Sequence, residues 1–318
     1  MPKAPTIEQL EAVHAVEPGD TIPGKPAMTA FRQRVRYHQA RWREAHGHPI
    51  GTNPIVPRAG GDARLVGNRM PLDYGRETGA NFVTPAALQA ARQRTSFVER
   101  EQSFDHQRFW ADLLWAPSMA FNLFGDLAAD VALANRAVHA LWPETPGRVS
   151  EVRFAHSPGR LDPAWLNSLR AWDAAFVVDL PDGTQGMLAV DVNYHEWAKP
   201  EIPKPENRKR NLEVAERSGA FRPGVYDRLL GRSALCLLWL EHLLLLSMLQ
   251  HPSGHWTWGR FVVVYPEGNV DFADATARYH DLLADTSTFG TMTIEDLVGA
   301  NVLPRSASKA FRDRYFGY

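Results

Sequence analysis

The chain has 318 residues, of which 44% are hydrophobic, so it is long enough to bury a core of ordinary size. Its 35 basic and 36 acidic residues give a formal net charge of -1, which excludes a protein that binds polyanions over its whole surface. A single cysteine, Cys236, excludes a disulfide framework, and the first residues show no basic segment followed by an apolar run, so we expect a cytoplasmic location.

The first part of the chain predicts helices between irregular stretches. Residues 1–27 are rich in proline and glycine, which predicts a loosely held arm with room for one short helix. Residues 30–45 have helix-forming composition with basic residues on several faces, and the stretch 47–61 predicts a loop. Thr84 and Pro85 are of the types found at an N-cap and a first helical position, so a helix is expected to begin there.

Apolar runs dominate the middle of the chain. A further helix is expected near Ser103, followed by two buried helices that meet at Pro117. After Gly147 the pattern changes to short runs rich in β-branched and aromatic residues, which predict strands. The predicted strands are 151–155, 173–180, 186–193 and 260–266.

The remaining residues predict helices. The most apolar run, 234–250, contains Glu241 and His242 and is shorter than the roughly 20 residues that span a bilayer, so we interpret it as a buried core helix. We expect an α/β fold in which residues 1–62 form an N-terminal arm with a basic helix. Residues 63–318 are expected to form one α/β domain.

The segment between the second and third predicted strands indicates a register. Residues 180–184, LPDGT, suit a type I turn followed by a left-handed glycine, the usual three-residue loop of a β-hairpin. Leu180 then pairs with Thr184, and the same antiparallel register places Asp173 opposite Asp191. Cross-strand partners share a face, so the two carboxylates are expected side by side, with Cβ atoms about 5 Å apart.

The two faces of this predicted hairpin differ in chemistry. Even-numbered positions are apolar and form the expected core face, whereas Asp173, Asp179, Asp191 and Asn193 lie on the odd-numbered face. Neighbouring carboxylates repel each other unless a cation neutralises them, and oxygen ligands on a rigid hairpin suit Mg²⁺. Such an ion can supply a hydroxide nucleophile and stabilise charge on a phosphodiester. The alternative, from spacing alone, is that the acids are simply solvated.

Five separated blocks of the chain resemble the PD-(D/E)XK nuclease superfamily, in particular a bacterial branch of restriction-endonuclease type. The blocks are GANFVTPAALQAARQR, FWADLLWAPSMAFNLFGDLA, VRFAHSPGR, AWDAAFVVDLPDGTQGMLAVDVNYHE and RYHDLLADTSTFGTMTIEDL. In this superfamily an Asp opens one strand, and an acid-x-Lys motif closes the strand that pairs with it. The resemblance implies a restriction-endonuclease-like α/β fold, with a mixed central β-sheet flanked by helices and an N-terminal helical extension.

The resemblance also implies roles for individual residues. Asp173 matches the first acid and Asp191 the acid of the acid-x-Lys motif, so both are expected to be ligands of Mg²⁺ or Mn²⁺. Asn193 stands where the branch has lysine; its amide can orient water or phosphate but carries no positive charge. Glu196 matches a frequent supporting acid. Ala155 stands where an upstream acid is expected.

Basic residues near the hairpin are candidates for contacts with nucleic acid. Lys199 could return a positive charge to the site, although a lone lysine before a proline is most often a solvated loop residue. Acids adjoin the basic residues after the hairpin and those of the helix at 30–45, so a solvated helix face is an equal alternative for both. The candidate phosphate contacts are Arg160, Lys199, Lys204, Arg208, Lys209 and Arg210.

No other catalytic pattern stands out. The sequence has no P-loop, dinucleotide-binding or nucleophile-elbow motif, and its histidines lack the spacing of a zinc site. The leading function is a Mg²⁺-dependent endonuclease that hydrolyses phosphodiesters in DNA. We expect no membrane partner. A homodimer would suit cutting of both strands. The alternative is a degenerate member that keeps the fold and binds DNA or a partner protein without cutting. The missing lysine and upstream acid favour that alternative.

Overall fold

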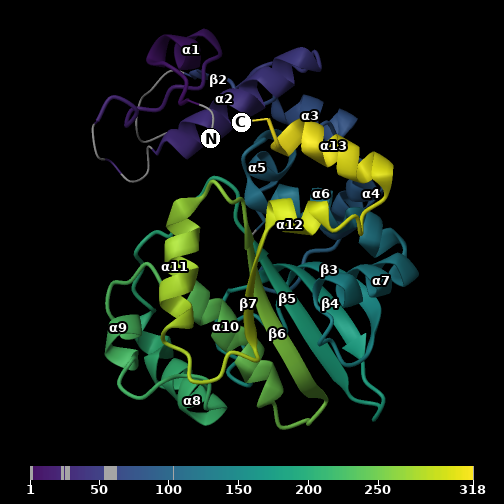
Figure 1. Ribbon diagram of the computed structural model, residues 1–318, viewed down its shortest axis with the longest axis vertical. Coiled ribbons are helices and arrows are strands. Elements are labelled where there is room, and N and C mark those ends of the chain that lie inside the picture. Colours follow the sequence, from purple (N-terminus) through teal and green to yellow (C-terminus); the bar gives the residue numbers. More distant parts are fainter. Residues whose placement is uncertain (1–2, 23–24, 26–28, 54–62, 103, 318) are drawn as a thin grey trace.

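A mixed five-stranded β-sheet lies at the centre of the computed structural model, which describes residues 3–22, 25, 29–53, 63–102 and 104–317 (Figure 1). The strands are β3 (Arg148–His156), β4 (Trp172–Asp179), β5 (Gln185–Val192), β6 (Trp256–Tyr265) and β7 (Phe289–Thr293). They lie in the order β3-β4-β5-β6-β7. The first three are antiparallel neighbours, whereas β5 pairs with β6, and β6 with β7, in parallel. The expected mixed α/β fold is confirmed.

The β4–β5 hairpin has the register that its turn predicts. The amide of Leu180 donates to the carbonyl of Thr184 at 3.0 Å. Gly183 has a φ of 84°, the left-handed conformation that glycine adopts without a Cβ penalty. Further along the hairpin, Ala174 pairs with Val190. The turn therefore sets which residues of the two strands face each other as far as the end that carries the acids.

One face of the sheet packs against helices from both halves of the chain (Figure 1). Phe176 and Val190 point into this core, where the rings of Phe121 and Phe154 stack with centroids 4.1 Å apart. The helices on this side are α4 (Pro85–Ser96), α5 (His106–Ala111), α6 (Ala116–Ala129), α7 (Val131–Leu141), α12 (Ile294–Gly299) and α13 (Arg305–Tyr315).

The opposite face of the sheet is also core, which corrects the expectation of a face that carries only the acids. Ala175, Val177 and Ala189 pack there against Trp239 and Leu243 of the central helix. None of the helices in the described ranges is long and apolar enough to cross a bilayer. The elements on this side are η2 (Pro205–Asn207), α8 (Arg208–Ser218), α9 (Tyr226–Leu230), α10 (Cys236–Leu249) and α11 (Val270–His280).

The described part of the N-terminal segment is packed, so the prediction of a loosely held arm is wrong there. Helix α1 spans Ile7–Ala12, and α2 spans Ala30–Ala45 as predicted. Leu10 and Val13 form a small core with Ala40 of α2. Burial of these apolar side chains holds α1 against α2.

The C-terminal helix α13 ties α2 to the end of β5. The guanidinium of the buried Arg314 donates to Asn81 O and Oδ1 at 2.6 and 2.5 Å and lies 4.8 Å from the ring centroid of Trp42. Gln39 Nε2 donates to Arg314 O at 2.8 Å and to Tyr194 Oη at 3.0 Å. Because Tyr194 follows β5 by two residues, these contacts place α2 beside the C-terminal end of that strand.

The other elements differ from the predictions at several points. Strand β7 is missing from the prediction, which assigned that part of the chain to helices. The predicted loop 47–61 contains a two-residue strand, β1 (Gly51–Thr52), which pairs with β2 (Leu65–Val66). Residues 54–62 and Ser103 lie outside the described residues. Pro117 is the second residue of α6. One further helix, α3, spans Leu72–Thr78.

Candidate active site

Asp173 and Asp191 lie side by side at one end of the sheet. Asp173 is the second residue of β4 and Asp191 the last but one of β5, next to the pair Ala174 and Val190. Asp191 is 8% exposed, and Asp173 is half-buried. Their carboxyl groups are close enough for each to perturb the pKa of the other. The pairing expected from the turn is therefore present.

Glu241, in the middle of α10, adds a third carboxyl group that the sequence analysis does not assign to the site. Its side chain is 6% exposed and contacts that of Asp191. Within the described residues its Oε2 is buried without a hydrogen-bond partner. Trp172 Nε1 donates to the backbone oxygen of Glu241 at 3.1 Å, which ties α10 to β4. The one sequence signal was an acid inside an apolar helix, where burial is costly unless the acid has a function.

Burial and mutual repulsion raise the pKa values of all three carboxyl groups. Burial raises the pKa of Asp173 and of Glu241, and the charge of Asp191 raises both further. Burial also raises the pKa of Asp191, but hydrogen bonds from Asn193, Glu241 and Asp173 oppose this rise. The hydrogen bonds favour the charged form of Asp191. A bound cation would favour the charged forms of all three carboxyl groups.

Asn193, which stands where the resemblance implies a lysine, holds Asp191 in place. Its side chain is 5% exposed, and its Nδ2 donates to Asp191 Oδ2 at 2.7 Å. The backbone amide of Val192 donates to Asp173 Oδ2 at 2.9 Å. Both acids are thus oriented by neutral donors, which add no positive charge to the site.

Arg170, in the loop before β4, brings a positive charge to the cluster. Its Nη2 lies 2.7 Å from Glu201 Oε2 and its Nη1 lies 3.9 Å from Glu241 Oε1. Burial lowers the pKa of Arg170, but the carboxylates of Glu241 and Glu201 outweigh this and raise it. The side chain remains 28% exposed and can be reached from solvent. Its loop has no regular pattern, so sequence alone could not single it out.

Ala155, where the resemblance implies an acid, lies opposite Asp173 in the register of β3 and β4. Its carbonyl accepts hydrogen bonds from Arg94 Nη2 at 3.2 Å and Arg160 Nη2 at 2.9 Å. Arg160 also forms an ion pair with Glu99, and its side chain is 5% exposed. The guanidinium of Arg160 is therefore engaged within the protein, which disfavours it as a phosphate contact.

His156, the last residue of β3, makes the stability of the folded protein depend on pH. Burial lowers its pKa to about 4, and its Nε2 is buried without a partner among the described residues. The unfolded chain binds a proton near pH 6.5, so the free energy of unfolding should fall by about 3 kcal/mol between pH 6.5 and pH 4 because of this residue. Urea unfolding of the wild type and of His156→Leu measures this. Parallel pH profiles of the two proteins would contradict it.

Glu196 lies near the acid pair without contacting it. Its Oε2 accepts from the amide of Tyr194 at 2.8 Å, and its Oε1 lies 3.7 Å from His195 Nδ1. Its charge contributes to the raised pKa values of Asp173 and Asp191. Burial lowers the pKa of His195, which favours the neutral form of its ring. Glu196 therefore stabilises the turn after β5 and adds negative charge to the site.

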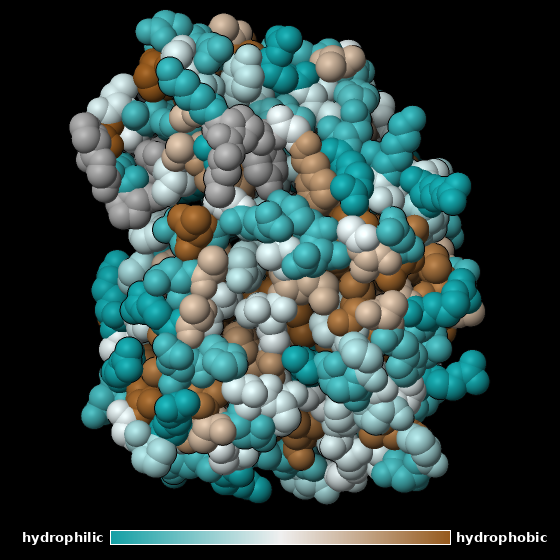
Figure 2. All heavy atoms as spheres, viewed as in Figure 1, coloured by the Kyte–Doolittle hydropathy of each residue, from teal (hydrophilic) through white to brown (hydrophobic). Residues whose placement is uncertain are grey.

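The basic residues after β5 fall into two groups. Arg210 is half-buried and donates to the backbone carbonyls of Trp165 at 2.8 Å and Ala164 at 3.1 Å, so it is engaged within the protein. On the face of the molecule seen in Figure 2, hydrophilic side chains cover much of the surface, and hydrophobic side chains lie in small groups between them. The exposed basic residues of the predicted set are Lys199, Lys204, Arg208 and Lys209.

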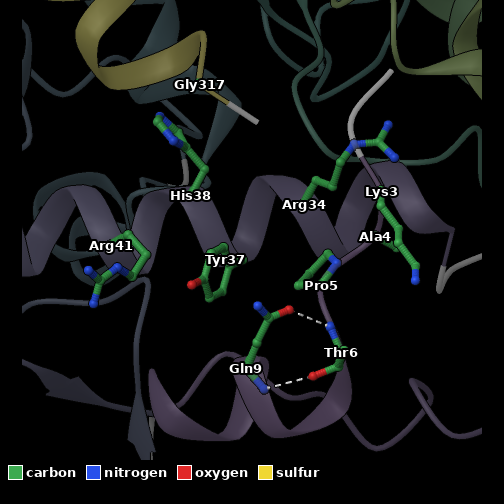
Figure 3. A pocket seen from close by; sticks show the side chains of 10 residues that line it. All are labelled: Lys3, Ala4, Pro5, Thr6, Gln9, Arg34, Tyr37, His38, Arg41 and Gly317. Carbon is green, nitrogen blue, oxygen red and sulfur yellow. Dashed lines mark hydrogen bonds between the residues drawn. The ribbon is translucent and has the colours of Figure 1, made fainter.

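The basic helix α2 presents little of its charge to solvent. Arg34, Arg36 and Arg43 are buried, whereas Arg41 is exposed. Arg36 pairs with Asp20 at 2.5 Å. Arg34 and Arg41 line a cavity of about 590 Å³ beside α1 (Figure 3). The three buried arginines are therefore part of the packing of α2, and neither a phosphate-binding nor a solvated helix face describes them.

The carboxyl cluster fits a divalent cation of the Mg²⁺ or Mn²⁺ type. Its donors are all carboxyl oxygens, and one oxygen of Glu241 is buried without a partner. Over the described ranges, no group of three or more histidine, cysteine, aspartate or glutamate side chains is already arranged to hold a metal ion. Mg²⁺ needs only one or two carboxylates, because it keeps several waters and takes other ligands from a substrate.

Comparison with known proteins supports the same assignment. A profile of the PD-(D/E)XK nuclease superfamily matches residues 26–317. Searches of curated proteins and of solved structures gave no match. The matched region includes α2, which the sequence analysis assigned to the arm, and the boundary at residue 62 stays a prediction. From the extent of the match and the mixed sheet that carries paired acids, the chain belongs to the PD-(D/E)XK nuclease superfamily.

Proposed function

We propose that the protein is a metal-dependent phosphodiester hydrolase, a DNA endonuclease of restriction type. The observation that carries the proposal is the contact among the carboxyl groups of Asp173, Asp191 and Glu241 at the end of the sheet. Membership of the superfamily supports nuclease chemistry in general. Buried carboxyls with perturbed pKa values are costly to the fold, and a catalytic or binding role would explain their presence.

Asp191, together with Asp173 or Glu241, would hold Mg²⁺ or Mn²⁺. When bound, such an ion supplies Lewis-acid stabilisation of the charge that develops on a phosphodiester and a more acidic water. The chain contributes orientation: Asn193 fixes Asp191, and the amide of Val192 fixes Asp173. Fixed ligands need no rearrangement when the substrate binds, which lowers the barrier to reaction.

Arg170 would supply the positive charge that Asn193 lacks. A guanidinium has several donors in one plane and matches a phosphate well. Glu201 and Glu241 hold one part of it while 28% of the side chain remains exposed. It can therefore contact a phosphate that lies against the carboxyl cluster, in the way that a lysine on β5 would.

Replacing Arg170 by alanine is expected to lower the rate of DNA cleavage by about 100-fold, because one charge that stabilises the transition state is lost. Arg170→Lys should lower the cleavage rate by a smaller factor, because lysine keeps the positive charge. Adding Asn193→Lys to Arg170→Ala should recover part of the rate, since it returns a cation beside Asp191. Single-turnover rates at saturating Mg²⁺ measure all three.

Arg278→Ala is the matched control, because Arg278 pairs with Asp274 on the exposed side of α11 at 3.2 Å. Its rate should equal that of the wild type. Full activity in Arg170→Ala would show that the missing charge is not supplied by Arg170.

The exposed basic residues after β5 would contact the DNA backbone. Lys199, Lys204, Arg208 and Lys209 are exposed and follow the strand that carries Asp191. Cations along such a path bind phosphates with little regard to sequence and make the affinity depend on salt. They would hold the strand with its backbone towards the carboxyl cluster.

A second function is favoured by two specific residues. Asn193 replaces the lysine of the motif, and Ala155 replaces an upstream acid opposite Asp173. Both changes suit a protein that keeps the fold and binds DNA or a protein partner without cutting. Glu241 and Arg170 favour the enzyme, because they bring a third carboxyl and a cation to the same place.

Incubation of the protein with supercoiled plasmid in Mg²⁺ or Mn²⁺ separates the two functions. The enzyme is expected to nick or linearise the plasmid, and Asp173→Ala should not. If neither the wild type nor Asp173→Ala cuts the plasmid, and the protein retards DNA in a gel with or without metal, the enzyme is rejected and the binding protein is favoured.

A further inference from the structure

A cavity of about 420 Å³ lies next to the carboxyl cluster. Leu240, the neighbour of Glu241 on α10, forms part of its wall, and Arg170 lines it as well. Arg170 thus borders the cavity and approaches Glu241 to 3.9 Å. A ligand in this cavity would lie beside the groups proposed to act on a phosphodiester.

Asn211 of α8 lines the cavity and carries an unsatisfied polar atom. Its side chain is 1% exposed, and its Oδ1 is buried without a hydrogen-bond donor within the described residues. Its neighbours in the wall are satisfied: Asn167 Nδ2 donates to Asn207 Oδ1 at 3.0 Å, and Asn207 Nδ2 donates to Asn167 O at 2.9 Å. Buried acceptors are normally paired, so the lone acceptor of Asn211 points to a ligand that donates a hydrogen bond.

Apolar side chains form the other part of the wall. Groups of exposed large hydrophobic residues are uncommon on protein surfaces, and an apolar surface beside polar groups marks a binding site. Leu161 has a φ of 51°, a left-handed conformation that is uncommon for a bulky residue. The apolar residues are Leu161, Leu169 and Ile202, with exposed fractions of 43%, 49% and 59%.

These features together match the chemistry of one nucleotide. A nucleobase has two apolar faces, which suit the leucine and isoleucine side chains, and an edge with N–H donors, which suits Asn211 Oδ1. A phosphate suits Arg170 and the exposed Lys204, which also lines the cavity. The volume of the cavity is within the range of small-ligand sites.

We propose that this cavity binds one unpaired nucleotide of the nucleic-acid strand, with its base against Asn211 and its phosphate towards Arg170. The inference rests on the proposed nuclease function and deepens it, because it says which part of the strand lies beside the carboxyls. A base in a duplex must leave the stack to enter such a cavity, at a cost that a single strand does not have. The protein should therefore bind single-stranded DNA more tightly than a fully paired duplex, and it should cut a duplex only where a base leaves the stack.

The test is a binding measurement that needs no cleavage. Fluorescence anisotropy of labelled single-stranded and duplex oligonucleotides in Ca²⁺ gives the affinities of the wild type and of Asn211→Leu. The variant should bind the single strand about 10-fold more weakly. Its melting temperature should be unchanged or higher, because an unpaired buried acceptor is removed. Arg278→Ala should match the wild type in both measurements.

Several results would overturn the proposal. The first is equal affinity of Asn211→Leu and the wild type for the single strand. The second is an Asn211→Leu protein with a lower melting temperature as well as a lower affinity. The third is a wild type that binds the duplex more tightly than the single strand, or that binds neither. Displacement of the strand by equimolar free deoxynucleoside monophosphate would assign the cavity to free nucleotides instead. A wild type that binds as expected but cuts no DNA would reject the nuclease alone, so the two failures are distinguishable.

Discussion

Replacing Asp191 by asparagine is expected to reduce metal-dependent cleavage of DNA by about a thousandfold. Asp191 contacts the carboxyls of both Asp173 and Glu241, so its loss removes the centre of the proposed metal site. Losses of this size are typical when a group that stabilises the charge of a transition state is removed. Single-turnover cleavage in Mg²⁺ and in Mn²⁺ measures the effect.

The matched control is Asp179→Asn, at the other end of β4. Asp179 is exposed, and its Oδ1 accepts hydrogen bonds from Ser150 and Gln185. It belongs to the same hairpin and has the same chemistry, but it lies away from the cluster. It should cut at the wild-type rate. Equal rates for Asp191→Asn and Asp179→Asn would place the chemistry elsewhere.

Glu241→Gln is expected to stabilise the metal-free protein by about 2 kcal/mol at pH 7 and to lower the cleavage rate by about 100-fold. The pKa of Glu241 is raised in the folded state by burial and by Asp191. A group with a raised pKa stabilises the fold only in its protonated form, so this contribution is lost as the pH rises. Glutamine keeps the shape of the protonated form at every pH.

Urea unfolding at several pH values checks this prediction. The difference in free energy of unfolding between Glu241→Gln and wild type should be small at pH 4 and should grow towards pH 7. Mg²⁺ should narrow the difference at pH 7, because it stabilises the wild type by binding its carboxylates. A variant that is less stable than the wild type at pH 7 would refute the account of Glu241.

The hairpin and its acid pair could be predicted because local chemistry determines them. Gly183 takes up the left-handed conformation that the turn needs, and the pairing of Leu180 with Thr184 follows from it. Strand residues alternate between faces, so a known register also determines which side chains meet. Asp173 and Asp191 were therefore found without any knowledge of distant contacts.

Glu241 and Arg170 could not be predicted, because only the tertiary structure brings them to the site. Glu241 lies 50 residues after Asp191 in a helix whose other positions read as core. Its presence there was a signal, since a buried acid needs a partner or a function. Nothing in the sequence indicated which strand end α10 would reach.

The wrong predictions also have physical reasons. The odd-numbered positions of the hairpin include Ala175, Val177, Met187 and Ala189, a continuous apolar run that indicates a strand covered on both faces. Strand β7 has the sequence FGTMT, which is short, contains glycine and precedes a strong helix pattern. Its pairing with β6 supplies the stability that its own sequence lacks.

The most direct test of the proposed site is a crystal structure of the protein with Mn²⁺, with the ion located by its anomalous scattering. The account predicts one ion about 2.2 Å from a carboxylate oxygen of Asp191, with a second ligand from Asp173 or Glu241. The ion should be absent from Asp191→Asn crystals treated in the same way. A wild-type protein that binds no Mn²⁺ at saturating concentration, or binds it away from these three residues, would contradict the account.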